Sequence, residues 1–203
     1  MENDIIEIKY AMDTFYFLIS GVLVMWMAAG FTMLEAGLVR SKNTTEILAK
    51  NVALYSIACV MYLIMGYTVM YGGISNLYVP DGFFGISASN ASAEEVLASG
   101  GDTYYSGASD FFFQVVFVAT AMSIVSGAVA ERMKLWAFLA FAVVMTGFFY
   151  PMQGSWSWGG GFLGENIGYS DYAGSGIVHL CGAAAALAGV LILGPRLGKY
   201  SAS

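Results

Sequence analysis

Five long segments without a charged residue are the feature that most constrains this chain. They lie between Asp13 and Glu35 and over residues 51–80, 111–130, 135–164 and 172–195. A helix that crosses about 30 Å of hydrocarbon needs roughly 20 mostly apolar residues, and each segment supplies that length. The composition agrees, because 58% of the 203 residues are hydrophobic, 11% are charged and the mean hydropathy is +0.69. The sequence therefore predicts an all-α, polytopic transmembrane bundle and excludes an ordinary soluble domain.

The expected spans belong to a single membrane domain that covers residues 1–203. They extend over about residues 14–36, 49–71, 111–130, 135–153 and 172–194. Two of the uncharged segments are longer than one crossing needs. Gly72 and Gly73 are expected to end the second helix, and Pro151 with the glycines after it to end the fourth. The remainders of these two segments are predicted to form extramembrane or re-entrant loops.

The basic residues gather in alternate connections between the spans. They are Arg40, Lys42 and Lys50 after the first span, Arg132 and Lys134 after the third, and Arg196 and Lys199 after the fifth. The loops over 72–110 and 152–171 carry acidic residues and no Lys or Arg. Because Lys and Arg in short loops stay on the cytoplasmic side, the N-terminus is predicted outside and the C-terminus in the cytoplasm. The N-terminus lacks the basic segment of a signal peptide, so the first helix is expected to be retained.

Ionisable residues at membrane depth are costly, so each one needs an explanation. Glu35 is interpreted as an interfacial residue that reaches headgroup water or Arg40, and Lys50 as a side chain that extends to the interface. His179 is the single histidine and is expected about 10 Å into a fifth helix that starts near residue 172. Imidazole, with a pKa near 6.5, can accept or relay a proton. A plain packing role is the alternative for a histidine in a helix.

Small residues surround His179 on the predicted helix. Those expected on its face are Ser175, Gly176, Gly182, Ala183 and Ala186. They predict either a narrow passage or the close helix packing that is common in membranes. Asp171 is predicted to cap the same helix, because its carboxylate can accept backbone N–H groups of the first turn. Cys59 and Cys181 are interpreted as apolar packing residues, and neither a metal site nor a cofactor is predicted.

Aromatic residues mark the outer ends of the third and fourth helices. Trp156 and Trp158 precede three consecutive glycines, which allow a close approach of the backbone. They form either an interfacial aromatic belt or a cation site, since the face of an indole ring attracts cations. Phe113 and Phe117 are four residues apart and share one helix face.

Four ordered motifs run along the chain. They are AGFTMLEAGLVRSKN at 29–43, GAVAER at 127–132, WGGG at 158–161 and DYAGSGIVH at 171–179. Together they resemble the ammonium transporter (Amt/Mep/Rh) family over about residues 14–200. The resemblance implies that Trp158, Phe113 and Phe117 form the outer recruitment site and aromatic gate. It also implies that Asp171 supports this region and that His179 is the first histidine of a paired relay in the pore.

The family's architecture implies that this chain is incomplete. Members carry two inverted repeats of five helices plus one further span, and the chain resembles the first repeat. The second pore histidine, the second gating phenylalanine and a serine of the recruitment site belong to helices that this sequence does not contain. The family also implies a multi-pass plasma membrane protein, a homotrimer in its complete form and a PII-type cytoplasmic regulator.

The expected function is transport of ammonium or ammonia. The alternatives are the membrane module of an ammonium sensor and a structural half that pairs with another subunit. An enzyme is not expected, because the sequence has no paired carboxylates at membrane depth, no nucleophile with a base and no phosphate-binding loop. A nucleic-acid partner is not expected either.

Overall fold

The computed structural model describes residues 2–198, and five helical segments in it are long and apolar enough to cross a membrane. They cover Asn3–Leu38, Ser41–Tyr71, Gly107–Val129, Leu135–Ser155 and Ser175–Leu193. The prediction of an all-α protein with five candidate spans is confirmed. Lys199, which contributed to the predicted orientation, lies outside the described residues.

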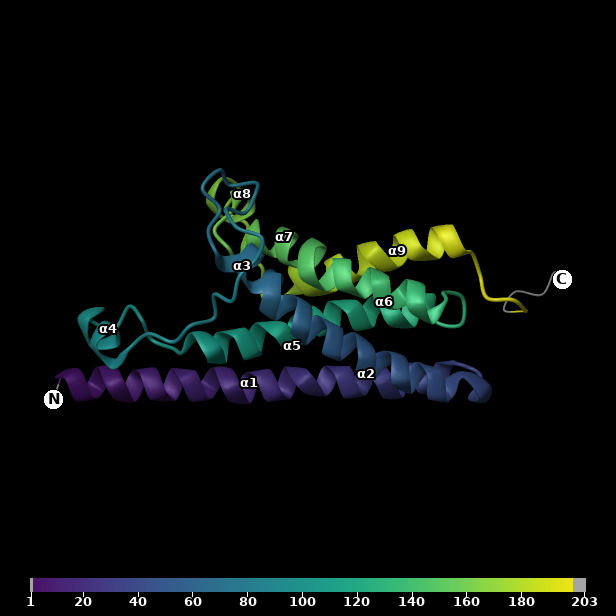
Figure 1. Cartoon of the computed structure of the whole chain (residues 1–203), viewed down its shortest axis with the longest axis horizontal. Helices are drawn as coiled ribbons and strands as arrows, with labels where there is room; N and C mark the ends of the chain where they lie inside the picture. The colour runs from purple at the N-terminus through teal and green to yellow at the C-terminus, as the bar shows by residue number, and fades with distance from the viewer. Residues whose placement is uncertain (1, 199–203) are drawn as a thin grey trace.

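The first helix is longer than the sequence predicted. Helix α1 (Glu2–Leu38) has 37 residues, which is about 55 Å at 1.5 Å per residue. Its apolar part contains the predicted span over residues 14–36, and its first turns carry exposed charged residues such as Glu7 and Lys9. Figure 1 shows α1 along the whole molecule, with the short helix α4 (Ala93–Ala98) beside its N-terminal part. The N-terminal part of α1 is therefore held by contacts with the loop that contains α4.

The second and fourth spans each consist of two α-helices joined by a π-helical segment. The second span contains η1 (Ser41–Asn43), α2 (Thr44–Met61), η2 (Tyr62–Gly66) and α3 (Tyr67–Tyr71). The fourth contains α6 (Leu135–Val144), η3 (Met145–Phe149) and α7 (Tyr150–Ser155). As predicted, Gly72 follows the last residue of the second span and forms its C-cap.

The fourth span continues two residues past its expected end near residue 153, because Pro151 does not stop the helix. Pro151 lies in the first turn of α7, and the helix continues to Ser155. Proline lacks the N–H for a helical hydrogen bond, and the wider π turn just before it provides the adjustment that an α-helix interior would not. The two π segments contact each other. A Cβ on Gly66 would overlap the Tyr62 ring and lie 3.1 Å from the Pro151 ring, so the glycine permits this close packing.

Helix α5 (Gly107–Val129) lies at the centre of the bundle and supplies much of the core. It contacts α1, α2 and α9 (Cys181–Leu193), and α9 follows directly on the π segment η4 (Ser175–Leu180). A Cβ on Gly182 would lie 2.8 Å from the Ala121 carbonyl oxygen, so the small residue lets α9 approach α5 closely.

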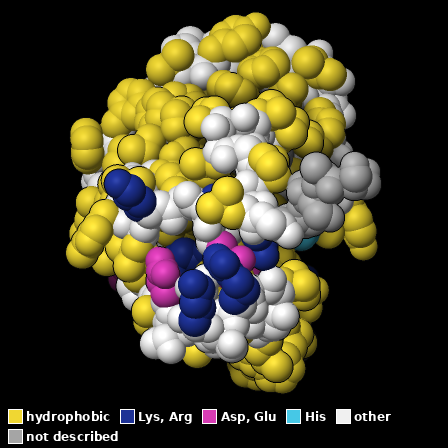
Figure 2. All heavy atoms as spheres, turned by 90° about the vertical axis from the view of Figure 1, so that its right-hand side faces the viewer, with side chains coloured by type: hydrophobic (Ala, Val, Ile, Leu, Met, Phe, Trp, Pro, Cys, Tyr) yellow, Lys and Arg dark blue, Asp and Glu magenta, His cyan; other side chains and the backbone are white. Residues whose placement is uncertain are grey.

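The basic connections lie together at one end of the molecule. The α1–α2 turn, the α5–α6 turn and the chain after α9 are at the right of Figure 1. Figure 2 shows Lys and Arg side chains on this end, with acidic groups between them. The α4 region and α8 (Phe162–Glu165) lie toward the other end. Below, "inner end" means the end with the basic connections and "outer end" the opposite one.

Candidate functional site

The structure brings the two predicted gate phenylalanines into contact near the outer end of α5. The ring centroids of Phe113 and Phe117 are 5.1 Å apart, and the rings are nearly perpendicular. Phe17 of α1 contacts the Phe113 ring edge-on at 5.2 Å and stacks on Tyr105 at 4.4 Å. Edge-to-face and offset stacks are favourable aromatic geometries. Phe17 and Tyr105 were missed in the sequence, because only the tertiary fold places them beside Phe113.

Trp158 lies on a different element, in the turn that follows α7. Its backbone N–H donates to the Gly154 carbonyl at 3.0 Å, and its half-buried ring packs against the hydrophobic core. The far edge of the indole lies 3.6 Å from the position that a Cβ on Gly174 would take. The indole N–H of Trp156 donates to the Tyr78 carbonyl at 2.8 Å. Trp156 thus fixes an outer loop, whereas Trp158 borders the turn that leads into η4.

Asp171 caps the fifth span, as predicted, but from further away along the chain. Its carboxylate accepts the backbone N–H of Ile177 at 2.6 Å and that of Gly176 at 3.2 Å. The helix begins at Ser175 instead of near residue 172, because Ala173 and Gly174 have positive φ angles and form a turn. A Cβ on Gly176 would clash with the Tyr169 hydroxyl. The carboxylate and the glycine together define where the helix starts.

His179 lies within the π segment, and its side chain is exposed. It follows the first helical residue, Ser175, by only four positions, so it lies closer to the start of the helix than predicted. Its backbone N–H donates to the Gly174 carbonyl at 3.0 Å. Through this hydrogen bond, His179 is attached to the turn at Gly174, which the Trp158 indole borders. π-Helical turns occur frequently at functional sites.

The small residues near His179 do not all share its face. Gly182 and Ala186 are buried, and Gly182 packs directly against α5, whereas Ser175 and Ala183 are exposed together with His179. The extra residue per turn in η4 shifts the register that α-helical spacing predicts. One set of small residues therefore serves helix packing, and the other is exposed, as His179 is.

The interpretation of Glu35 and Lys50 as interfacial residues is wrong. Their exposed fractions are 3% and 5%, and the Lys50 Nζ lies 3.2 Å from the Glu35 Oε2. The Ser126 hydroxyl donates to the same oxygen at 2.8 Å, and the Lys50 Nζ lies 5.0 Å from the centre of the Phe138 ring. Helices α1, α2 and α5 converge here, and the two buried charges neutralise each other. Two opposite charges in consecutive predicted spans were the signal that could have revealed this pair.

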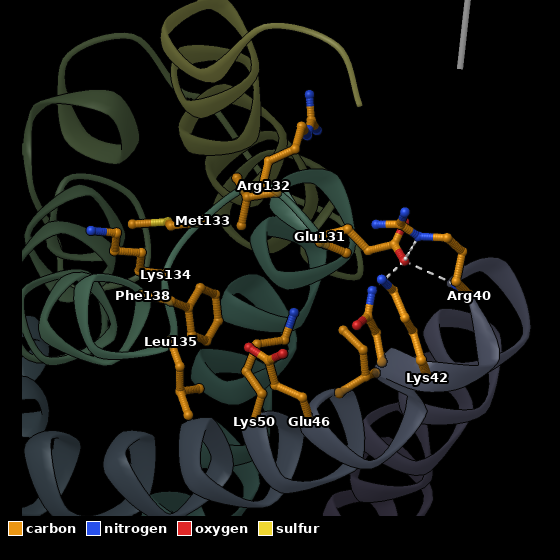
Figure 3. A pocket seen from close by; sticks show the side chains of 14 residues that line it. Arg40, Lys42, Glu46, Lys50, Glu131, Arg132, Met133, Lys134, Leu135 and Phe138 are labelled. Carbon is orange, nitrogen blue, oxygen red and sulfur yellow. Dashed lines mark hydrogen bonds and ion pairs between the residues drawn. The ribbon is translucent and has the colours of Figure 1, made fainter. Parts of the chain in front are cut away.

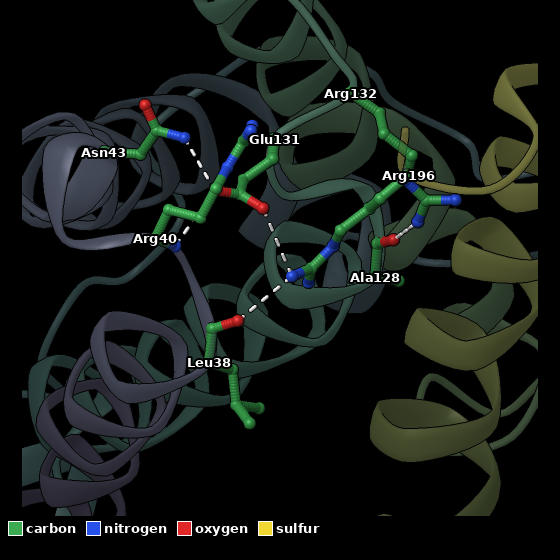
Figure 4. Close-up of polar contacts among 7 residues, drawn as sticks. All are labelled: Leu38, Arg40, Asn43, Ala128, Glu131, Arg132 and Arg196. Atoms are coloured by element: carbon green, nitrogen blue, oxygen red, sulfur yellow. Dashed lines mark hydrogen bonds and ion pairs between the residues drawn. The ribbon is translucent and has the colours of Figure 1, made fainter. Parts of the chain in front are cut away.

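A second polar cluster joins three connections at the inner end (Figure 4). The Glu131 Oε1 accepts the backbone N–H and the Nε of Arg40, each at 3.0 Å, and the Asn43 side chain at 2.6 Å. The Glu131 Oε2 lies 3.4 Å from the Arg196 guanidinium, which also donates to the Leu38 carbonyl at 3.0 Å. The Arg40 backbone N–H, with further donors from Arg40 and Asn43, holds the pKa of Glu131 at about 2.

A cavity of about 280 Å³ opens between these two clusters at the inner end. Figure 3 shows Lys50 and Glu46 rising toward it from α2, with Phe138 beside them. Arg132, also on its wall, donates to the carbonyls of Ala128 and Gly194. The arrangement fits a structural polar core better than a catalytic site, since its charges are largely engaged by partners.

The comparisons with known proteins agree on one family. The chain matches the model of the Ammonium Transporter Family over residues 15–203. A putative ammonium transporter of Synechocystis is 42% identical over 200 residues, which cover 98% of this chain and 43% of that protein. The ammonium transporter Amt2 of Archaeoglobus fulgidus is 38% identical, over 93% of this chain and 40% of the relative.

A solved structure gives the same result for the fold. The structure named Sensor Amt Protein matches with a TM-score of 0.83 and 28% identity, over 96% of this chain and 47% of that chain. The chain thus spans less than half of the length of these relatives. With five candidate spans and a family match over nearly its full length, the chain belongs to the ammonium transporter family, whose members are membrane transporters and not enzymes.

Proposed function

We propose that this chain forms one half of a conduit that carries ammonium or ammonia across the plasma membrane. Trp158, Phe113 and Phe117 constitute the outer recruitment site and gate, where the aromatic faces attract the cation and replace part of its water. The contact between Phe113 and Phe117 supports a gate of touching rings. Relatives named ammonium transporters support the choice of substrate.

His179 is the proton relay of the proposed conduit. An intact cation is costly to move through hydrocarbon, and separating it into ammonia and a relayed proton lowers this barrier. The observation that carries the proposal is the exposed His179 imidazole on a π turn that Asp171 supports. The exposed imidazole lies on an apolar span, where it is available to a passage between this chain and the proposed second half.

The remaining partners follow from the same proposal. The second half of the conduit covers the His179 face, the N-terminus is outside and the basic inner end faces the cytoplasm. The complete protein assembles as a homotrimer, and its cytoplasmic connections are accessible to a PII-type regulator. The clustering of Lys and Arg at one end supports this orientation.

The test replaces His179 with alanine in the full-length protein reconstituted into liposomes. We expect the ammonium-dependent current to fall by at least about tenfold, because a positioned acid–base group is lost. Leu187→Ala, an exposed position further along α9, is the matched control and should leave the current unchanged. Equal current and selectivity in His179→Ala and the unmodified protein would contradict the relay.

A second candidate function is sensing. The fold match to the structure named Sensor Amt Protein favours it. A sensor would bind ammonium without conducting it, so saturable binding in the purified full-length protein together with no flux in liposomes would replace transport by sensing.

A further inference from the structure

The carboxylate of Glu35 has partners on only one of its two oxygens. The Ser126 hydroxyl at 2.8 Å and the Lys50 ammonium at 3.2 Å both reach Oε2. Oε1 is buried and has no hydrogen-bond partner among the residues that the structure describes. A buried carboxylate oxygen without a donor is costly, and such atoms in folded proteins are rare and call for an explanation.

Glu35 also lines a cavity of about 240 Å³ between α1 and α5. Most of its walls are apolar, and they include Phe31, Leu34 and Ile124. A Cβ on Gly127 would lie 3.5 Å from the Glu35 Cγ and 4.0 Å from Oε1, so the glycine leaves space beside the carboxylate. One water occupies about 30 Å³ of the liquid, and the cavity therefore has room for small molecules.

The charges around this cavity leave Oε1 available to a donor. Lys50 approaches Glu35 through Oε2, and it lines the other inner cavity. Arg196 lies on the wall of the Glu35 cavity, but its guanidinium is engaged by Glu131 and by the Leu38 carbonyl. A small molecule with N–H groups matches a mostly apolar space that offers one strong acceptor. An alkali cation requires a more complete shell of oxygen ligands.

We propose that the cavity beside Glu35 is an inner binding site for ammonium or ammonia, in which an N–H group donates to Oε1. The site deepens the proposed transport function and rests on it. It lies on α1 at the inner end, whereas Trp158 and the phenylalanine pair belong to the outer end. A ligand in this cavity would occupy the inner part of the protein, at the opposite end from the proposed recruitment site.

The experiment measures ammonium-driven currents of the full-length protein in liposomes, with ammonium applied in turn to each face. Glu35→Gln keeps the size of the side chain and removes its charge. We expect the ammonium concentration for half-maximal current to rise about tenfold from the inner face and to stay constant from the outer face. Glu46→Gln, an exposed glutamate on α2, is the matched control and should change neither value. Unchanged values from both faces, or an equal rise from both, would overturn the inner site.

A charge exchange separates ligand binding from simple ion pairing. In the double variant Glu35→Lys, Lys50→Glu the ion pair is retained, but the carboxylate now belongs to α2, away from the cavity. We expect the double variant to be more thermally stable than Lys50→Ala and close to the unmodified protein. Its ammonium affinity from the inner face should still be reduced. Recovery of the inner-face affinity would show that only the ion pair matters. The transport proposal is tested independently, because its failure would appear as an unchanged current in His179→Ala.

Discussion

The outer and inner ends of the bundle are held together by different interactions. At the outer end, rings contact rings around Phe113, and the Asp171 carboxylate accepts backbone N–H groups at the start of η4. At the inner end, Glu35 and Glu131 each join charged groups from separate helices or connections. The rings around Phe113 thus present polarisable surfaces, whereas Glu35 and Glu131 pair full charges with opposite partners.

The difference shows how an ammonium transporter fold places charge. For the proposed recruitment site, a fixed cation beside the outer aromatic rings would repel ammonium, whereas neutral rings would attract it without such a penalty. Buried charges at the inner end are tolerated because each has an opposite partner within about 3 Å to 4 Å, which is the condition for an ion pair at membrane depth.

The largest effect is expected from Lys50→Ala, which leaves the Glu35 carboxylate buried and unpaired. Breaking a buried ion pair in this way costs about 3 to 5 kcal/mol of unfolding free energy. The measurement is unfolding of the full-length protein in detergent micelles. Lys42→Ala, at an exposed position of the same inner end, should cost less than about 0.5 kcal/mol. Equal losses in the two variants would remove the distinction between buried and surface charges.

At the outer end, Asp171→Ala removes the acceptor for two backbone N–H groups. We expect a loss of about 1 to 2 kcal/mol in unfolding free energy, as for other helix caps, and a lower ammonium current because η4 carries His179. Asp102→Ala in an exposed part of the outer loop is the control. A normal current in Asp171→Ala at wild-type stability would mean that the cap does not position η4.

A smaller effect, dependent on pH, is expected at Glu131. The pKa of this carboxyl is about 2 in the folded protein, below its ordinary value of 4.5. A lowered carboxyl pKa stabilises the folded state above pH 4.5, and the contribution disappears as the pH falls toward 2. With allowance for solvent screening, Glu131→Gln should cost about 1 kcal/mol at neutral pH.

The check for Glu131 is the difference in stability between Glu131→Gln and the unmodified protein across this range. The gap should close as the pH decreases from 4.5 toward 2. A gap that stays constant with pH would show that the carboxylate charge is not what stabilises the inner cluster.

An effect of similar size concerns a single ring contact at the outer end. A double-mutant cycle of Phe17→Ala and Phe113→Ala should give a coupling energy of about 0.5 to 1.5 kcal/mol. Phe17→Ala combined with Trp136→Ala should be additive, because Trp136 is exposed at the start of α6. An additive result for the first pair would leave the rings at the outer end without a measurable structural role.

Hydropathy was sufficient to predict the five spans, because the length of an uncharged segment depends only on the local sequence. The cap by Asp171 was also predictable, since a carboxylate near a helix start has few other uses. The start of the helix itself was not, because the positive φ angles at Ala173 and Gly174 delay it to Ser175.

Features that depend on the rotation and neighbours of the helices could not be predicted from hydropathy alone. The Glu35–Lys50 pair exists because α1 and α2 face each other at one depth, which hydropathy does not describe. A π turn contains about one more residue than an α turn, and hydropathy does not reveal this difference. In η4 it places the exposed His179 on a different side of the helix from the buried Gly182 and Ala186. The first turns of α1 are polar and do not look like part of a membrane span in sequence. In the structure they are helical and contact α4.

The contacts of Arg196 give the inner end a mechanical property. This side chain follows the last span directly and is attached both to the Leu38 carbonyl at the end of α1 and to Glu131 after α5. Tension on the chain beyond Arg196 is therefore transmitted to the ends of the first and third spans at once. An element that pulled on the chain there would act as a lever on the inner end of the bundle, at a distance from the residues proposed to act at the outer end.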